Sequence, residues 1–173
     1  TGLPVMHSHF DLPVEALGIL RADCPHYFRG KVGDESEDEF VSRLLKNLKK
    51  LILEEGAETI AAFIAEPLMG AGGVIVPPEG YLPKVQALLK EHDIFLWADE
   101  VICGFGRTGN DFGSTTMGIK PDLMSLAKQL SSAYVPISAA VIPGEMYEAM
   151  AHLSADVGMF GHGYTSHLLL YNL

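Results

Sequence analysis

A helical repeat of apolar residues is the clearest pattern in the chain, and it predicts a helix that begins after Ser36 and ends near Gly56. Ser36 can cap the first turn, and Glu39, three residues later, has the spacing of a capping box. Gly56 suits the end of a helix because it tolerates a left-handed backbone. The apolar positions that recur at helical spacing are Phe40, Val41, Leu44, Leu45, Leu48, Leu51 and Ile52.

Two further helices are predicted from the same kind of reasoning. Residues 79–91 carry Pro83 in the first turn, where a missing N–H is tolerated. The apolar positions on one face of this segment are Leu82, Val85, Leu88 and Leu89. Residues 145–153 are predicted to form a shorter helix near the end of the chain.

Four short apolar runs predict β-strands at residues 60–65, 94–98, 123–127 and 137–142. The first two are apolar at consecutive positions, which is typical of strands that are buried on both faces. Because apolar strands alternate with amphipathic helices, we expect an α/β fold with a mostly parallel sheet covered by helices.

The predicted elements divide the chain into three parts. Residues 1–35 are interrupted by prolines and glycines and are expected to be an irregular N-terminal segment. Residues 36–153 hold every predicted helix and strand and form the expected α/β core. Residues 154–173 follow the last predicted helix as a C-terminal tail.

Composition and charge argue against several classes of protein. The sequence is 48% hydrophobic and 20% charged, which is too apolar for a disordered chain. Its 22 acidic and 12 basic residues give a formal net charge of −10, so no nucleic-acid partner is expected. No uninterrupted apolar run reaches about 18 residues, so no membrane-spanning segment is expected either.

The cysteine content bears on the compartment. The chain has two cysteines, Cys24 and Cys103, which are too few for a disulfide scaffold. We therefore expect a reducing compartment, the cytoplasm. The first four residues contain neither a basic region nor an apolar core and are not expected to form a signal peptide; an organelle presequence would lie before Thr1.

Three charged residues come directly after predicted strands. Glu66 follows the first strand, Asp99 the second and Lys128 the third. Ligands of parallel α/β sheets bind beyond the carboxyl ends of the strands, so we expect these residues to share one edge of the sheet. A single charge at such a place usually closes a strand and faces solvent. A carboxylate and an amine that converge there can instead hold a heteroaromatic cation and form an imine.

The Gly-rich segment after the second strand has another possible interpretation. Gly104 to Gly109 matches the G-x-G-x-x-G pattern of dinucleotide-binding proteins. That site needs a helix to begin at the loop and receive the pyrophosphate. The residues that follow, from Asn110 to Thr116, are poor openers of a helix. The dinucleotide interpretation is therefore disfavoured.

Two other constellations are also disfavoured. A metal site could be built from four residues whose spacing is unlike that of zinc sites, namely His7, His9, Cys24 and His26. Ser131 and Ser132 near Lys128 could suggest a Ser/Lys hydrolase, but no G-x-S-x-G motif is present. We expect these small residues to let the chain turn or let a ligand approach closely.

The same motifs resemble those of the class III aminotransferases, which depend on pyridoxal 5′-phosphate (PLP). The motifs that carry the resemblance are Ala65-Glu66-Pro67, the Gly70–Gly73 loop, the run from Ala98 to Gly109, Pro121-Asp122, the run from Ala127 to Ser132, and His162-Gly163-Tyr164-Thr165. Nearly the whole chain is covered, most strongly from Ile60 to Ile142. The ordered series is specific, and it is most similar to the ω-amino-acid or amine:pyruvate branch, including 4-aminobutyrate:pyruvate enzymes. The fold that this resemblance implies is part of the large domain of fold type I PLP enzymes.

The resemblance implies a role for each matching residue near the strand ends. Lys128 would form the Schiff base with PLP and carry the proton during the transfer. Asp99 would pair with the pyridine nitrogen and keep it protonated, which makes the ring an electron sink. Val101 would pack against one face of the ring, and Glu66 would lie near the cofactor and the substrate.

Two further positions bear on the branch and on assembly. Ile102 stands where many relatives carry a glutamine that reaches the ring hydroxyl, and its apolar side chain fits the amine:pyruvate branch better. Thr165 would donate its hydroxyl to the cofactor phosphate of the neighbouring subunit. The resemblance therefore implies a homodimer.

The implied activity moves an amino group from an amine or ω-amino acid to a 2-oxo acid such as pyruvate. Members of the family are far longer than 173 residues, so we expect this chain to be part of the cofactor domain. After Thr165 the family usually continues with Ser-Gly-His-Pro, whereas this chain continues differently from Ser166 to Leu173. The alternative is a non-catalytic remnant or binding module that is inactive as a 173-residue chain.

Overall fold

The computed structural model describes residues 18–157, with side chains described as far as residue 154. The elements in order are α1 (Tyr27–Gly30), α2 (Glu37–Glu55), η3 (Ala57–Thr59), β1 (Ala62–Ala65), α3 (Tyr81–Glu91), β2 (Phe95–Asp99), α4 (Gly113–Thr116), β3 (Leu123–Leu126), η4 (Lys128–Leu130), β4 (Ala139–Val141) and α5 (Gly144–Val157). The predicted order of longer helices and strands is confirmed. The chain divides into two units, Thr1–Val141 and Ile142–Leu173, which are described separately.

Helix α2 begins and ends at the predicted capping residues. Ser36 Oγ accepts a hydrogen bond from the Glu39 N–H at 3.4 Å, and Glu39 Oε2 accepts one from the Ser36 N–H at 2.9 Å. Gly56 ends the helix with φ at 87°, a conformation that favours glycine. Of the predicted apolar positions, Leu45 and Leu51 are half-buried, and those that are buried are Phe40, Val41, Leu44, Leu48 and Ile52.

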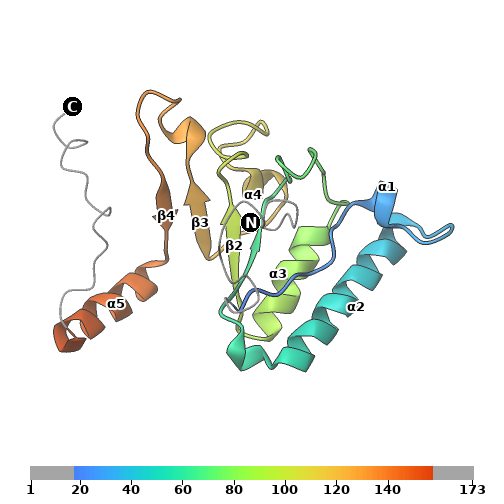
Figure 1. Ribbon diagram of the computed structural model, residues 1–173, viewed down its shortest axis with the longest axis horizontal. Coiled ribbons are helices and arrows are strands. Elements are labelled where there is room, and N and C mark those ends of the chain that lie inside the picture. Colours follow the sequence, from blue (N-terminus) through green and yellow to red (C-terminus); the bar gives the residue numbers. More distant parts are fainter. Residues whose placement is uncertain (1–17, 158–173) are drawn as a thin grey trace. The chain divides into compact units, whose positions relative to one another are not determined.

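Helix α3 packs beside α2 on one face of the sheet (Figure 1). The four apolar residues predicted for its inner face, Leu82, Val85, Leu88 and Leu89, are all buried. They form one core with the buried face of α2, Tyr81, Ile94, Leu96 and Ile119. Burial raises the pKa of the Tyr81 phenol to about 12, since the charged phenolate is disfavoured there.

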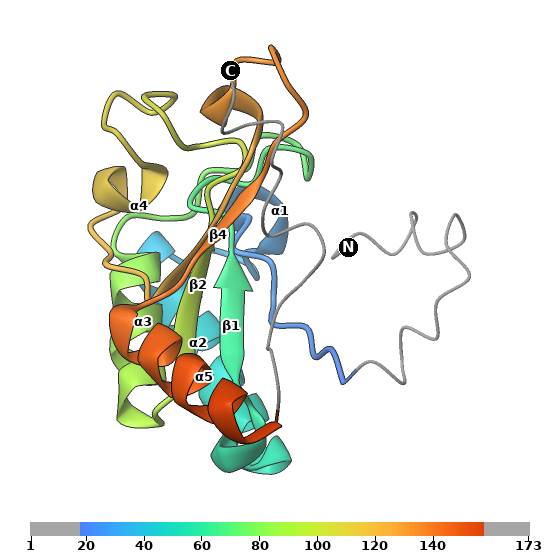
Figure 2. The same cartoon turned by 90° about the vertical axis from the view of Figure 1, so that its left-hand side faces the viewer.

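The sheet has the strand order β1-β2-β3-β4. β1 pairs with β2 and β2 with β3 in parallel, whereas β4 runs antiparallel to β3. The predicted α/β fold with a mostly parallel sheet is confirmed. The loops that follow β1 and β2 leave the sheet at the same end, as Figures 1 and 2 show. This end is the carboxyl edge where the site was expected.

The prediction that the first strand is buried on both faces is wrong. Ile64 is 58% exposed, and Phe95 on the neighbouring strand is 38% exposed. Side chains alternate between the two faces of a sheet, so Leu96 points into the core beneath α3 while Ile64 points away from it. A continuous apolar run indicates that both faces of a strand could be buried. It does not tell whether a helix or loop of the chain covers the second face, and here Ile64 on that face is exposed.

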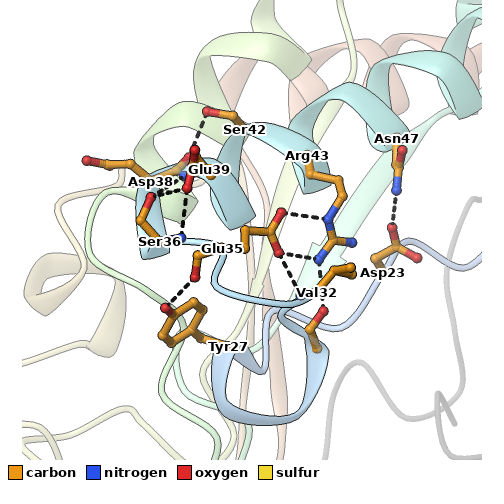
Figure 3. A network of polar contacts seen from close by, with 11 residues as sticks. Asp23, Tyr27, Val32, Glu35, Ser36, Asp38, Glu39, Ser42, Arg43 and Asn47 are labelled. Carbon is orange, nitrogen blue, oxygen red and sulfur yellow. Dashed lines mark hydrogen bonds and ion pairs between the residues drawn. The ribbon is translucent and has the colours of Figure 1, made fainter.

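The segment before α2 is fixed to that helix by polar contacts (Figure 3). Arg43 Nε and Nη2 each donate to one carboxylate oxygen of Glu35 at 2.8 Å, and Nη2 also donates to the Gly30 carbonyl at 2.8 Å. Asn47 Nδ2 donates to Asp23 Oδ2 at 2.7 Å. The hydrogen bonds from Arg43 lower the pKa of the Glu35 carboxyl. Within the segment expected to be irregular, the described residues 18–35 thus hold one short helix, α1, and are anchored to α2.

The second unit contains α5, which confirms the helix predicted over residues 145–153 and continues to Val157. Among the helices that the structure describes, none is long and apolar enough to cross a membrane.

Candidate active site at the carboxyl edge of the sheet

The strand register places the predicted site residues at one edge. Ala65 of β1 pairs with Ala98 of β2, so Glu66 and Asp99 come at equivalent positions on neighbouring strands. Asp99 in turn pairs with Ser125 of β3, three residues before Lys128. Three adjacent parallel strands therefore each deliver one charged residue to the carboxyl edge, which is where ligands of such sheets bind.

Asp99 is the last residue of β2 and is half-buried. Its Oδ1 accepts a hydrogen bond from the Val101 N–H at 3.1 Å, which holds the carboxylate over the turn that follows the strand. On the same face, Trp97 Nε1 donates to Ser125 Oγ at 2.9 Å and links β2 to β3. The carboxylate is thus presented on a rigid strand end rather than on a free loop.

Lys128 begins η4, two residues after β3, and its side chain is exposed. Its φ is 49°, in the left-handed region that non-glycine residues adopt only at a cost. Ser132 and Ala133 also have positive φ, at 52° and 67°. Strained backbone of this kind is characteristic of functional sites.

Glu66 turns back onto the loop that follows it. Its Oε2 accepts a hydrogen bond from the Gly70 N–H at 2.8 Å. Gly70 in turn lies against Ile102, since a Cβ on Gly70 would come 2.3 Å from Ile102 Cδ1. Val101 and Ile102 are both half-buried. The loops after β1 and β2 therefore pack together above the sheet edge.

The Gly-rich segment forms successive turns, and α4 begins only at Gly113. A helix does not begin at Gly109, so the geometry of a dinucleotide loop is absent from this segment. Near the tip of the loop, Arg107 Nη2 donates to Gln129 Oε1 at 2.6 Å. This contact joins the loop after β2 to the residue beside Lys128.

The remaining candidates do not add to this edge. No group of three metal-binding side chains occurs in the described part of the chain, and His7 and His9 lie outside it. Ser131 Oγ donates to the Val135 carbonyl at 2.7 Å, which is a turn contact. Thr165 also lies outside the described residues.

Glu100 was not predicted to be a site residue from its position in the sequence. It is completely buried, and its carboxylate accepts three hydrogen bonds, from the backbone N–H groups of Gly113 and Ser114 and from the Ser114 hydroxyl. A carboxylate after a strand usually faces solvent, so spacing alone did not reveal this contact. Gly113 and Ser114 begin a short helix, and the first N–H groups of a helix have no partner within it. These N–H groups are the signal that could have suggested a buried acceptor such as Glu100.

Comparison with known proteins decides the family. The family model for "Aminotransferase class-III" matches residues 8–167. Gamma aminobutyrate transaminase 1, mitochondrial, from Solanum lycopersicum is 56% identical over 165 residues, which are 95% of this chain and 32% of that protein. This chain belongs to the class III aminotransferases.

Other relatives agree with this placement. Gamma aminobutyrate transaminase 3, chloroplastic, from the same species is 55% identical over 165 residues, which are 95% of this chain and 31% of that protein. The structure of the omega transaminase from Pseudomonas jessenii in complex with PMP is 55% identical with a TM-score of 0.89, and covers 95% of this chain and 36% of that one. The chain therefore spans about a third of the length of the class III aminotransferases that it matches. The predicted resemblance to the class III aminotransferases is confirmed, and the proteins that this chain matches include gamma aminobutyrate transaminases and an omega transaminase.

The donor groups at the carboxyl edge fit the cofactor on which class III aminotransferases depend, PLP. A half-buried carboxylate on a strand end suits a protonated ring nitrogen. A primary amine at the end of the next strand suits an aldehyde. Asp99 ends β2, and Lys128 lies two residues after β3, the strand that pairs with β2.

Proposed function

We propose that this chain is the cofactor-binding part of an aminotransferase that moves an amino group from an amine or ω-amino acid to a 2-oxo acid such as pyruvate. One observation carries the proposal: Glu66, Asp99 and Lys128 follow three adjacent parallel strands at one edge of the sheet. The sequence identity to the transaminases above supports it.

Asp99 is assigned the role of holding the ring nitrogen of PLP in its protonated form. When bound, PLP supplies an electron sink that stabilises a carbanion on the substrate. The Val101 N–H already donates to Asp99 Oδ1 at 3.1 Å, which fixes the position of the carboxylate at the end of β2. A carboxylate held in a fixed position is the group needed beside a cationic ring.

Lys128 is assigned the covalent and proton-carrying role. Lys128 Nζ would hold PLP covalently, and the same amine, once displaced by the amine of the substrate, would carry the proton of the transfer. A primary amine is the group that forms an imine with an aldehyde. Lys128 begins η4 with a φ of 49°, two residues after the end of β3.

The neighbouring residues are assigned contacts rather than chemistry. Val101 would pack against one face of the ring. Glu66 would lie near the cofactor and substrate, and its carboxylate accepts the hydrogen bond from the Gly70 N–H. Ile102 presents an apolar side chain and cannot bond the ring hydroxyl, in keeping with the amine:pyruvate branch. Thr165 is assigned to the cofactor phosphate of a partner subunit.

The wider setting follows from these roles. Small amines and 2-oxo acids are the proposed substrates, and a homodimer is the proposed assembly because Thr165 would serve the neighbouring site. The two relatives from Solanum lycopersicum are described as mitochondrial and chloroplastic, so an organelle of this kind is a second compartment to set beside the predicted cytoplasm.

The test compares Lys128→Ala with Lys120→Ala in the complete protein. Lys120 is an exposed lysine on the loop before β3 and serves as the matched control. Incubation with PLP should give an absorbance band at about 410 nm in the wild type and in Lys120→Ala, and none in Lys128→Ala. Transamination of an amine with pyruvate should follow the same pattern. Unchanged absorbance and turnover in Lys128→Ala would refute the assignment.

The same assay separates the alternative function. A non-catalytic binding module would show the band at about 410 nm without any transfer of the amino group to pyruvate or another 2-oxo acid. An aminotransferase would show both.

A further inference from the structure

We propose that Glu100 is a positioning residue for Asp99 and Val101, and that it acts by closing both ends of the loop of residues 101–112 onto the end of β2. The inference rests on the proposed function, because it concerns how the residues assigned to PLP are held. Asp99 and Glu100 are consecutive, yet one is half-buried at the sheet edge and the other is completely buried.

The backbone of Glu100 is fixed on both sides. Its N–H donates to the Ser125 carbonyl of β3 at 3.0 Å. Its carbonyl accepts from the Gly104 N–H at 2.9 Å, which closes the first turn of the loop. A Cβ on Gly104 would lie 2.9 Å from that same carbonyl oxygen, so the turn is as close as glycine permits.

The side chain of Glu100 holds the far end of the loop. Oε1 accepts from the Ser114 N–H and the Ser114 hydroxyl, both at 2.6 Å, and Oε2 accepts from the Gly113 N–H at 2.9 Å. Hydrogen bonds to an ionised acceptor are stronger than neutral ones. All of them are buried, so water does not compete for the donors. Glu100 therefore bonds both ends of the loop: its backbone carbonyl bonds Gly104 near the start, and its carboxylate bonds Gly113 and Ser114 just after the end.

Packing leaves the far end little room to move. A Cβ on Gly113 would lie 2.6 Å from Cys103 Cβ and 3.0 Å from Pro67 Cβ. Cys103 is itself tied to the loop after β1, because its Sγ donates to the Leu68 carbonyl at 3.4 Å. The hydrogen bonds between Glu100 and residues 113–114, which we call the Glu100 clamp, thus lie against the turns that follow β1 and β2.

The loop that is clamped carries the contacts of the site. The Val101 N–H bonds Asp99 Oδ1 at the start of the loop, and Arg107 bonds Gln129 beside Lys128 near its tip. If the Glu100 carboxylate no longer bonded Gly113 and Ser114, both contacts would lie on a loop whose far end has lost these hydrogen bonds. Glu100 touches neither substrate nor cofactor in this scheme and acts only through the loop.

The variants are Glu100→Gln, Ser114→Ala and, as a matched control, Thr115→Ala. Glu100→Gln keeps the size of the side chain but places an NH₂ group among N–H donors. Ser114→Ala removes only the hydrogen bond from the Ser114 hydroxyl and keeps the two from backbone N–H groups. It is the milder variant and tests the proposal if Glu100→Gln does not fold. Thr115 is exposed on the same short helix. All are made in the complete protein.

The first measurement is amide hydrogen exchange of residues 101–112 without PLP. Glu100→Gln and Ser114→Ala should speed this exchange by about tenfold or more, since a buried hydrogen bond is lost, while Thr115→Ala should not. This reading is independent of cofactor binding.

The second measurement is the pH midpoint of the absorbance at about 410 nm of bound PLP, together with kcat and KM. Weaker pairing between Asp99 and the ring makes the ring a poorer electron acceptor. The nitrogen of Lys128 attached to PLP then keeps its proton to higher pH, so the midpoint should rise by about 0.5 unit or more in Ser114→Ala. We expect kcat to fall while the KM of the amine changes less than twofold.

The outcomes separate this proposal from the proposed function. Unchanged exchange in both variants overturns the clamp. Faster exchange with an unchanged pH midpoint and unchanged kcat also overturns it, because Glu100 would then be structural only. A wild-type protein that shows no absorbance with PLP refutes the proposed function and with it the positioning role, whereas the exchange comparison still decides whether Glu100 holds the loop.

Discussion

Gly70 and Ile102 lie so close together that a Cβ on Gly70 would come 2.3 Å from Ile102 Cδ1. We predict that Gly70→Ala destabilises the protein by about 1–3 kcal/mol and weakens PLP binding, because the added methyl forces the two loops apart. Ile102→Val removes the Cδ1 atom, so Gly70→Ala should cost less in that background. Thermal unfolding and PLP titration of the two single variants and the double variant measure the coupling. Equal costs of Gly70→Ala in both backgrounds would contradict the contact.

The capping box at the start of α2 gives a prediction about stability alone. Ser36→Ala should lower the free energy of unfolding by about 1 kcal/mol, since the Glu39 N–H loses its acceptor. Ser36→Asp retains an acceptor at the cap and should be close to wild type. Denaturant unfolding measures both, and PLP binding should be the same in all three proteins. A matching loss in Ser36→Asp would show that the cap is not the cause.

The ion pair between Glu35 and Arg43 predicts a dependence of stability on pH. Hydrogen bonds from Arg43 lower the pKa of Glu35 below its usual value of 4.5. The folded state then binds the proton less readily than the unfolded state, so this stabilisation is present above about pH 4.5 and is lost as the pH falls through the lowered pKa. The difference in unfolding midpoint between wild type and Glu35→Gln should therefore be largest near neutral pH and shrink in acid.

Asp34→Asn is the matched control for that experiment. Asp34 is the exposed neighbour of Glu35, whereas Glu35 bonds Arg43 through both carboxylate oxygens. Its substitution should leave the pH dependence of the wild type intact. If the unfolding midpoints of wild type and Glu35→Gln differ by the same amount at neutral and at acid pH, the ion pair does not make stability depend on pH, and the prediction is wrong.

The two cysteines should react very differently with a thiol reagent. Cys24 is exposed and Cys103 is 2% exposed. Burial raises the pKa of the Cys103 thiol, and the nearby carboxylate of Glu100 raises it further. Because the thiolate is the reactive form, alkylation at mildly basic pH should be at least about tenfold slower at Cys103. Mass spectrometry of digested protein measures each site, and denaturation should make the two rates similar.

Helix α2 could be predicted in detail because its determinants are local. The capping pair Ser36 and Glu39 lies within one turn, and the buried stripe follows a period that the sequence displays directly. The charges at Glu66 and Asp99 could also be placed at one edge. Strand order fixes this, since residues that end neighbouring parallel strands must lie side by side.

The features that could not be predicted depend on contacts between distant residues. Whether Ile64 is covered depends on which element reaches its face of the sheet, and the composition of the strand does not encode that. The carboxylate of Glu100 is satisfied by Gly113 and Ser114, more than ten residues away across a loop of turns. The left-handed φ of Lys128 is likewise set by the surrounding fold, because lysine has no preference for it.

The backbone at Lys128 has a consequence for how descendants of this chain would diverge. A φ of 49° would suit glycine or asparagine better than lysine, so the fold by itself favours replacement there. The role proposed above for Lys128 requires an amine, and it would be a reason to keep lysine at this position. In a descendant that lost this role, neutral drift would be expected to replace Lys128 early, whereas α2 and its cap, which serve the fold, would persist. Position 128 would then distinguish descendants that keep the proposed role from those that have lost it, and this chain carries lysine there.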